Sequence, residues 1–237
     1  MHPMAIKPKR HIVDSKEVIY SSEHWQELSF FRQKAATILN ELENHHLQPI
    51  VYGSIARGDV KTTSDIDIFL PDISSSFQLE TILEHAKIQV ISRNVIQATP
   101  LHAMKAYLEI DATTTVSFPL MPLRRVEREF YKFSGEANLK KLENNQRVAG
   151  IDKRLMLIDP IQKGHIESSV LGNEEYVAKK LGINIETVKN RTRALLRRDL
   201  IGRTGVFVKK ELAPDDTFEL VLKKIAEVNP AVRRRLG

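Results

Sequence analysis

The sequence predicts a mixed α/β fold, an α+β arrangement in which a domain built on a mixed sheet precedes a mainly helical domain. Two observations predict this. Between residues 50 and 120, short runs rich in β-branched and aromatic residues alternate with amphipathic helical segments. Between residues 174 and 201, small and apolar residues recur at helical spacing on both sides of a glycine. At 237 residues the chain is long enough for two modules. We expect an N-terminal extension at 1–20, a first domain at 21–121, a helical bridge at 122–150 and a second domain at 151–237.

The first domain is predicted to begin with a helix at Ser22. Apolar residues from Trp25 to Leu42 recur three and four positions apart and fall on one face, with Ser22 as the N-cap. A short strand at 50–52 follows and runs into a Gly-Ser turn. Further strands are predicted at 66–70, 88–99, 105–111 and 114–120, with a helix that starts near residues 74–76.

The second domain is predicted to contain a helix-turn-helix. Gly182 marks a tight turn between two helices, and Asn184 or Glu186 opens the second one. Residues 200–208 then predict a β-hairpin wing, so that residues 164–211 would form a winged helix. A final helix is expected at 218–228, ended by Pro230.

The charge is unevenly distributed along a chain of net charge +6. Residues 1–145 contain 17 Lys and Arg against 18 Asp and Glu, whereas residues 146–237 contain 19 against 12. The second domain is therefore suited to contact a polyanion. The absence of Cys excludes disulfides, thiolate zinc sites and cysteine nucleophiles, so that a metal would be held by carboxylates or His. No apolar run approaches the roughly 20 residues of a membrane-spanning helix, and we expect an intracellular, cytoplasmic protein without a membrane partner.

Two features of residues 53–69 carry the first chemical signal. Asp65 and Asp67 are separated by one residue in a strand-like context, so both carboxylates project from the same face and can share divalent ions. Gly53 and Ser54 end a strand twelve residues before Asp65. Backbone amides and a hydroxyl at such a turn can approach phosphate oxygens closely. One half of the segment is thus suited to bind phosphate and the other to bind metal.

At these residues the sequence resembles the polymerase-β-type nucleotidyltransferase superfamily, and most of all its minimal nucleotidyltransferases. The pattern GSxARGD…SDIDI is matched at Gly53, Ser54, Ala56, Arg57, Gly58, Asp59, Ser64, Asp65, Ile66, Asp67 and Ile68. The resemblance covers roughly residues 50–120. It implies transfer of a nucleoside monophosphate from an NTP to an acceptor hydroxyl, with release of pyrophosphate. Two bound Mg²⁺ ions would assist this reaction, with Mn²⁺ as the alternative metal. ATP as the nucleotide rests on the resemblance alone.

The superfamily also implies a third carboxylate on a neighbouring strand, usually an Asp. Glu109 and Asp111 compete for this role, and we prefer Glu109 because larger apolar residues flank it. Asp65, Asp67 and Glu109 are then the expected metal ligands and catalytic carboxylates, the third acid serving as general base. Gly53, Ser54 and Arg57 are the expected nucleotide-binding residues, with an outward salt bridge as the alternative for Arg57.

Basic residues of the second predicted helix and the wing are the expected nucleic-acid contacts, either DNA or RNA. They are Lys189, Arg191, Arg193, Arg197 and Arg203. The leading hypothesis is a Mg²⁺-dependent nucleotidyltransferase whose acceptor, RNA, protein or small molecule, is left open. The alternative is a nucleotide-sensing DNA-binding regulator or antitoxin-like protein with little or no transferase activity. Homodimer formation is also left open.

Overall fold

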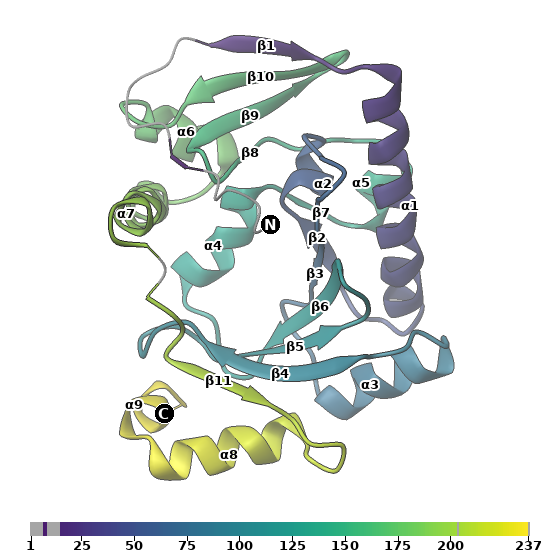
Figure 1. Ribbon diagram of the computed structural model, residues 1–237, viewed down its shortest axis with the longest axis vertical. Coiled ribbons are helices and arrows are strands. Elements are labelled where there is room, and N and C mark those ends of the chain that lie inside the picture. The colour runs from purple at the N-terminus through teal and green to yellow at the C-terminus, as the bar shows by residue number, and fades with distance from the viewer. Residues whose placement is uncertain (1–6, 9–14, 203, 237) are drawn as a thin grey trace. The chain divides into compact units, whose positions relative to one another are not determined.

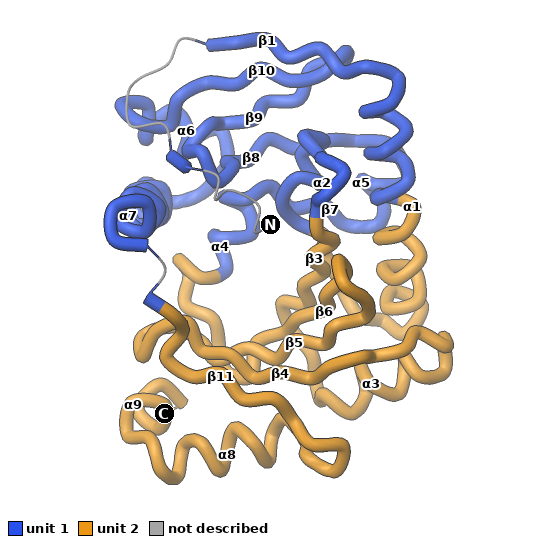
Figure 2. Tube along the Cα trace, viewed as in Figure 1, with its two compact units in different colours: residues 1–32, 52–64, 128–204 blue, residues 33–51, 65–127, 205–237 orange. Residues whose placement is uncertain are grey.

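A computed structural model describes residues 7–8, 15–202 and 204–236 (Figure 1). Of the predicted nucleic-acid contacts, Arg203 lies outside these residues. The chain forms two compact units that interleave along the sequence (Figure 2). The first unit contains residues 1–32, 52–64 and 128–204, and the second contains residues 33–51, 65–127 and 205–237. The consecutive domain boundaries expected from the sequence stay predictions.

The second unit is built on a mixed sheet, which confirms the predicted α/β class. Its strands are β2 (Ile50–Tyr52), β3 (Ile66–Phe69), β4 (Ser92–Gln97), β5 (Lys105–Glu109), β6 (Thr114–Pro119) and β11 (Val208–Glu211). They lie in the order β11-β4-β5-β6-β3-β2. Strand β3 runs parallel to β6, whereas the pairs β11–β4, β4–β5 and β5–β6 are antiparallel.

Helices accompany this sheet in the second unit. They are α3 (Ser76–His85), α8 (Phe218–Val228), α9 (Pro230–Leu236) and the later part of α1 (Ser22–Asn44). The Phe218 ring lies edge-on to Phe118 at 5.4 Å, and the Glu219 carboxylate accepts hydrogen bonds from Ser76 N at 3.0 Å and Ser76 Oγ at 2.7 Å. These contacts fix α8 against β6 and the start of α3.

The predicted wing is wrong. Leu200 and Ile201 belong to helix α7 (Ile185–Ile201), and Val208 begins β11, which pairs with β4 instead of with a neighbouring hairpin strand. The pairing begins before the strand itself, because Phe207 N donates to Ala98 O at 3.2 Å. The β-propensity of the segment was read correctly, but its hydrogen-bonding partner is a strand more than a hundred residues earlier.

The first unit contains an antiparallel sheet and short helices. The sheet consists of β1 (Lys16–Ile19), β8 (Gly150–Ile151), β9 (Met156–Ile161) and β10 (Gly164–Ser169), in the order β1-β10-β9-β8. The remaining elements are α2 (Ser54–Arg57), α4 (Arg125–Ser134, of which the unit takes in residues from 128 on), β7 (Glu136–Ala137), α5 (Leu139–Glu143), α6 (Glu174–Leu181) and α7. The start of α1 also belongs to this unit. Helix α1 begins at Ser22 as expected. The hydroxyl that caps it is that of Ser21 instead of Ser22, and this hydroxyl accepts from His24 N at 3.3 Å.

The two helices of the predicted helix-turn-helix are present at the expected residues. Gly182 ends α6 in the left-handed conformation (φ 61°, ψ 41°), and the Asn184 side chain caps α7 by accepting from Glu186 N at 2.8 Å. Ala178, Ile183 and Val188 are buried in one apolar cluster with residues of β8 and β9. The helical pair is therefore packed on the sheet of the first unit.

Candidate active site

The two aspartates of the D-x-D pattern lie at β3 in the second unit. Asp65 is exposed immediately before the strand and Asp67 is half-buried within it, whereas Ile66 and Ile68 are fully buried. This alternation puts the two carboxylates on one face of the strand and the two isoleucines in the core on the other face. The geometry is the one that the sequence pattern predicts.

Glu109 lies in the same row of the sheet as Asp67. The register pairs Asp67 with Thr115 on β6, and Thr115 in turn with Glu109 on β5. Residues paired directly across neighbouring strands share a face of the sheet, and neighbouring strands are about 4.8 Å apart. The Cα atoms of Asp67 and Glu109 are therefore about 10 Å apart, on the same face, with only Thr115 between them.

Tyr107 is a further member of this face, because it precedes Glu109 by two residues on β5. Burial and the negative charge of Asp67 together raise the pKa of the Tyr107 phenol to about 12. The phenol thus keeps its proton beside the carboxylate. Tyr107 and Thr115 are not among the site residues predicted from the sequence, although the two-residue period of the strand pointed to Tyr107.

Asp111 lies outside the row, in the turn between β5 and β6. Its Oδ1 accepts hydrogen bonds from Thr113 N at 2.9 Å and Thr113 Oγ1 at 3.0 Å, and its Oδ2 lies 2.8 Å from Lys34 Nζ. Burial opposes ionisation of this carboxyl, but the bonds from Lys34 and Thr113 outweigh it and hold the pKa of Asp111 well below its ordinary value. The carboxylate of Asp111 is thus engaged in forming the turn.

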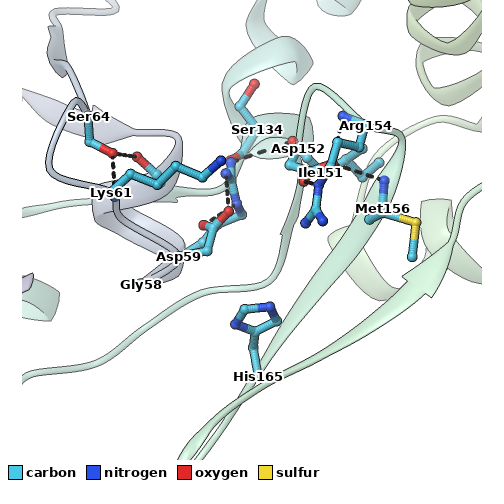
Figure 3. A network of polar contacts seen from close by, with 12 residues as sticks. Gly58, Asp59, Lys61, Ser64, Ser134, Ile151, Asp152, Arg154, Met156 and His165 are labelled. Atoms are coloured by element: carbon cyan, nitrogen blue, oxygen red, sulfur yellow. Dashed lines mark hydrogen bonds and ion pairs between the residues drawn. The ribbon is translucent and has the colours of Figure 1, made fainter. Parts of the chain in front are cut away.

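The Gly-Ser turn belongs to the first unit. Gly53 adopts φ 85° and ψ −146°, a conformation that is open essentially to glycine alone, and its N–H donates to Gly135 O at 2.9 Å. Ser54 Oγ donates to Ser64 Oγ at 3.2 Å. Ser64 Oγ also accepts from Lys61 N at 2.9 Å, and Figure 3 shows Ser64 and Lys61. Since Ser64 immediately precedes Asp65 in the chain, these bonds tie the Gly-Ser turn to the residue next to the first carboxylate.

The Arg57 guanidinium is bound by acceptors of the same unit. Its side chain is buried, and its Nε and Nη2 donate to the two carboxylate oxygens of Asp59, both at 2.9 Å. Its Nη1 donates to Ser134 O at 2.6 Å and lies at 3.5 Å from Ile151 O. The guanidinium is therefore engaged on all three nitrogens, which corresponds to the salt-bridge alternative, and phosphate binding by Arg57 is a prediction that this geometry does not favour.

The predicted nucleic-acid contacts on α7 fall into two groups. Lys189, Arg193 and Arg197 are exposed. Arg191 instead stacks over the Phe130 ring at 4.5 Å, and burial, with the nearby charge of Arg198, lowers the pKa of its guanidinium. Arg191 is thus only partly exposed, and a contact between it and a nucleic acid stays a prediction.

Among the described residues, no three His, Asp or Glu side chains gather closely enough to hold a metal ion by themselves. Asp65 and Asp67 nevertheless supply hard oxygen donors on one face of β3. Mg²⁺ is usually held by one or two carboxylates together with substrate phosphates and water, not by a full protein cage. The donor chemistry at β3 fits an ion of this kind. No helix in the described part of the chain is long and apolar enough to cross a membrane.

The strand that ends in the Gly-Ser turn and the carboxylate-bearing strand β3 of the mixed sheet are the features on which the resemblance to the nucleotidyltransferases rests. A curated relative agrees with this class. The chain is 41% identical over 63 residues, 23% of its own length and 73% of the relative's, to a protein of Methanocaldococcus jannaschii named putative protein adenylyltransferase. The chain belongs to the nucleotidyltransferase-type family of this relative. No family model matches the chain, and no solved structure matches it.

Proposed function

We propose that the chain transfers a nucleoside monophosphate, with ATP as the expected donor, to an acceptor hydroxyl and releases pyrophosphate. The observation that carries the proposal is the row of Asp67, Thr115 and Glu109 across three adjacent strands, with Asp65 two residues before Asp67. The curated relative supports the reaction class. In the reaction a bond forms between the acceptor oxygen and the α-phosphorus, the bond from that phosphorus to the bridging oxygen breaks, and the proton of the hydroxyl is released.

Each residue is given one task in this proposal. Asp65 and Asp67 would hold Mg²⁺, which when bound neutralises phosphate charge and stabilises the leaving pyrophosphate. The carboxylate of Glu109 accepts the proton of the acceptor hydroxyl as general base. Tyr107, whose pKa is raised by burial and by the charge of Asp67, stays protonated and donates no proton to the reaction.

The Gly-Ser turn contributes phosphate binding. The Ser54 hydroxyl exchanges its 3.2 Å hydrogen bond to Ser64 for one to a phosphate oxygen of the nucleotide. At Gly53 an added Cβ would meet nothing within 4 Å, so the surface beside this glycine is open to a ligand. Arg57 has no task in this proposal, because its nitrogens already have protein acceptors.

The acceptor class is taken from the relative, whose name describes transfer to protein. We therefore propose a protein hydroxyl, that of Ser, Thr or Tyr, as the first acceptor to test. RNA is the second arm of the same experiment, because the charge excess of residues 146–237 suits a polyanion.

The test is incubation of the purified chain with α-phosphate-labelled ATP and Mg²⁺, with a cell extract freed of small molecules in one arm and total RNA in the other. The double variant Asp65→Asn/Asp67→Asn is compared with Asp72→Asn/Asp215→Asn, in which two exposed carboxylates of the same unit are replaced. Label on a protein band or on RNA that disappears only in the first variant supports the proposal. Absence of transfer from ATP, and from each of the other three NTPs when it replaces ATP in the same assay, contradicts the proposal.

A further inference from the structure

The exposed face of α7 carries a row of three cations. Lys189, Arg193 and Arg197 are each exposed and follow one another at intervals of four residues. Residues four apart on a helix lie on one face, each about 6 Å further along the axis. The three charges therefore span little more than two turns, within an arc of about 80° around the helix.

The N-terminal end of α7 is hydrogen-bonded to α4 of the first unit. The Glu129 carboxylate on α4 accepts hydrogen bonds from Asn184 N at 3.1 Å and from the Thr187 hydroxyl. Thr187 and Val188 are buried, so Glu186, an acid, is the residue that this first turn exposes most. One turn later, Arg191 lies over the Phe130 ring.

This arrangement decides what kind of contact α7 can make. Helix-turn-helix proteins read base edges with the N-terminal residues of the second helix. Here that end is packed on α4, and its most exposed side chain would repel phosphate. The cationic row lies beyond that end, with Asn190 as an exposed amide beside Lys189. Cations in a line along a helix are suited to contact phosphates, which position a protein but carry no sequence information.

We propose that the row of Lys189, Arg193 and Arg197 binds the phosphodiester backbone of a nucleic acid without reading its sequence. The inference is independent of the proposed transferase activity, because it needs neither nucleotide nor metal. The shared chemistry is a line of phosphates, which duplex DNA and single-stranded RNA both present. The arms of the experiment distinguish these two sources.

The test measures affinity by fluorescence anisotropy with the full chain and no NTP. The probes are two 24-base-pair DNA duplexes of unrelated sequence and a single-stranded RNA of 24 nucleotides, each between 50 and 200 mM salt. The variant Lys189→Gln/Arg193→Gln/Arg197→Gln is compared with Lys87→Gln/Lys140→Gln/Lys163→Gln, which removes the same charge at exposed positions that are not on α7.

Three phosphate contacts correspond to a slope of log affinity against log salt of about −2.7 on duplex DNA and about −2.1 on a single strand. The α7 variant should lose that part of the slope and, near 150 mM salt, on the order of 100-fold in affinity. The control variant should keep the slope of the unmodified chain. Glu186→Gln should tighten binding a few-fold, because it removes the acid one turn before Lys189.

Four results would overturn the proposal. Two of them concern the variants: the salt slope is equal for the α7 variant and the unmodified chain, or the α7 and control variants lose affinity equally. The other two concern the probes: the chain prefers one duplex sequence over the other by more than tenfold, or it binds no probe at 50 mM salt. Circular dichroism checks that the variants fold. If the triple variant does not fold, the three single variants are tested in the same way. Each should change the slope of log affinity against log salt by about 1.

Discussion

Replacing Glu109 and Asp111 separately distinguishes the two candidates for the third carboxylate, which the sequence could not separate. Glu109→Gln removes the carboxylate that shares a row with Asp67, so loss of general-base catalysis should lower kcat by about 10²- to 10⁴-fold. The amide keeps the size of the side chain at a half-buried strand position, and the melting temperature should change little.

Asp111→Asn should leave the rate of transfer unchanged and lower the stability of the fold slightly. Its amide oxygen can still accept from Thr113, so what is lost is the ion pair with Lys34, a pair of partly exposed groups worth about 0–1 kcal/mol. That corresponds to a fall of at most about 2–4 °C in melting temperature, with transfer unchanged. The assay is the initial rate of labelled AMP transfer together with thermal unfolding of each variant. If a folded Asp111→Asn variant were inactive while Glu109→Gln stayed within threefold of the unmodified rate, the argument from strand register would be refuted.

Three further predictions concern stability. Burial lowers the pKa of His165 below its ordinary value of 6.5, so the unfolded state binds the proton more readily, and the free energy of unfolding should decrease as pH falls below about 6.5. The maximum loss is about 1.4 kcal/mol per unit of pKa depression, and His165→Gln should remove this part of the pH dependence in urea titrations; an unaltered pH dependence in that variant would argue against it. Gly53→Ala should lower the free energy of unfolding by about 1–3 kcal/mol, because φ 85° with ψ −146° is closed to alanine, and by more than Gly182→Ala, whose left-handed conformation other residues do adopt. Glu219→Ala should lower it by about 2–3 kcal/mol, because the buried N–H and O–H of Ser76 lose their shared acceptor. Chemical denaturation measures both, and a loss at Gly53 smaller than at Gly182, or below 0.5 kcal/mol at Glu219, would contradict the respective argument.

Much of the fold followed from local patterns, because their physical cause is local. The two-residue period around Asp65 and Asp67 was enough to predict one polar and one buried face of β3, since strand geometry admits no other outcome. Gly182 and Asn184 likewise marked the boundaries of α6 and α7, because a left-handed glycine often ends a helix and an Asn side chain often caps the start of one.

Contacts between residues far apart in the sequence explain why the pairing of β11 and the contact of Arg191 were not predicted. The residues before Val208 have strand propensity, but nothing local specifies that β11 adds to the edge at β4 instead of folding back as a hairpin. The same limit applies to Arg191, because a basic residue on a helix is expected in solvent unless its neighbours are known. Here the neighbour is Phe130, on an element sixty residues earlier.

The motif that led to the family contains two kinds of residue, and only the structure separates them. Gly53, Ser54 and the aspartates are the residues to which the proposal gives ligand contacts, whereas Arg57 binds Asp59 and the carbonyl oxygens of Ser134 and Ile151. Gly58 belongs to the second kind as well, since a Cβ there would lie 2.5 Å from the side chain of Arg147. A match of the motif at Arg57 and Gly58 therefore bears on how the loop folds, while the proposed phosphoryl chemistry rests on the carboxylate row and on the curated relative.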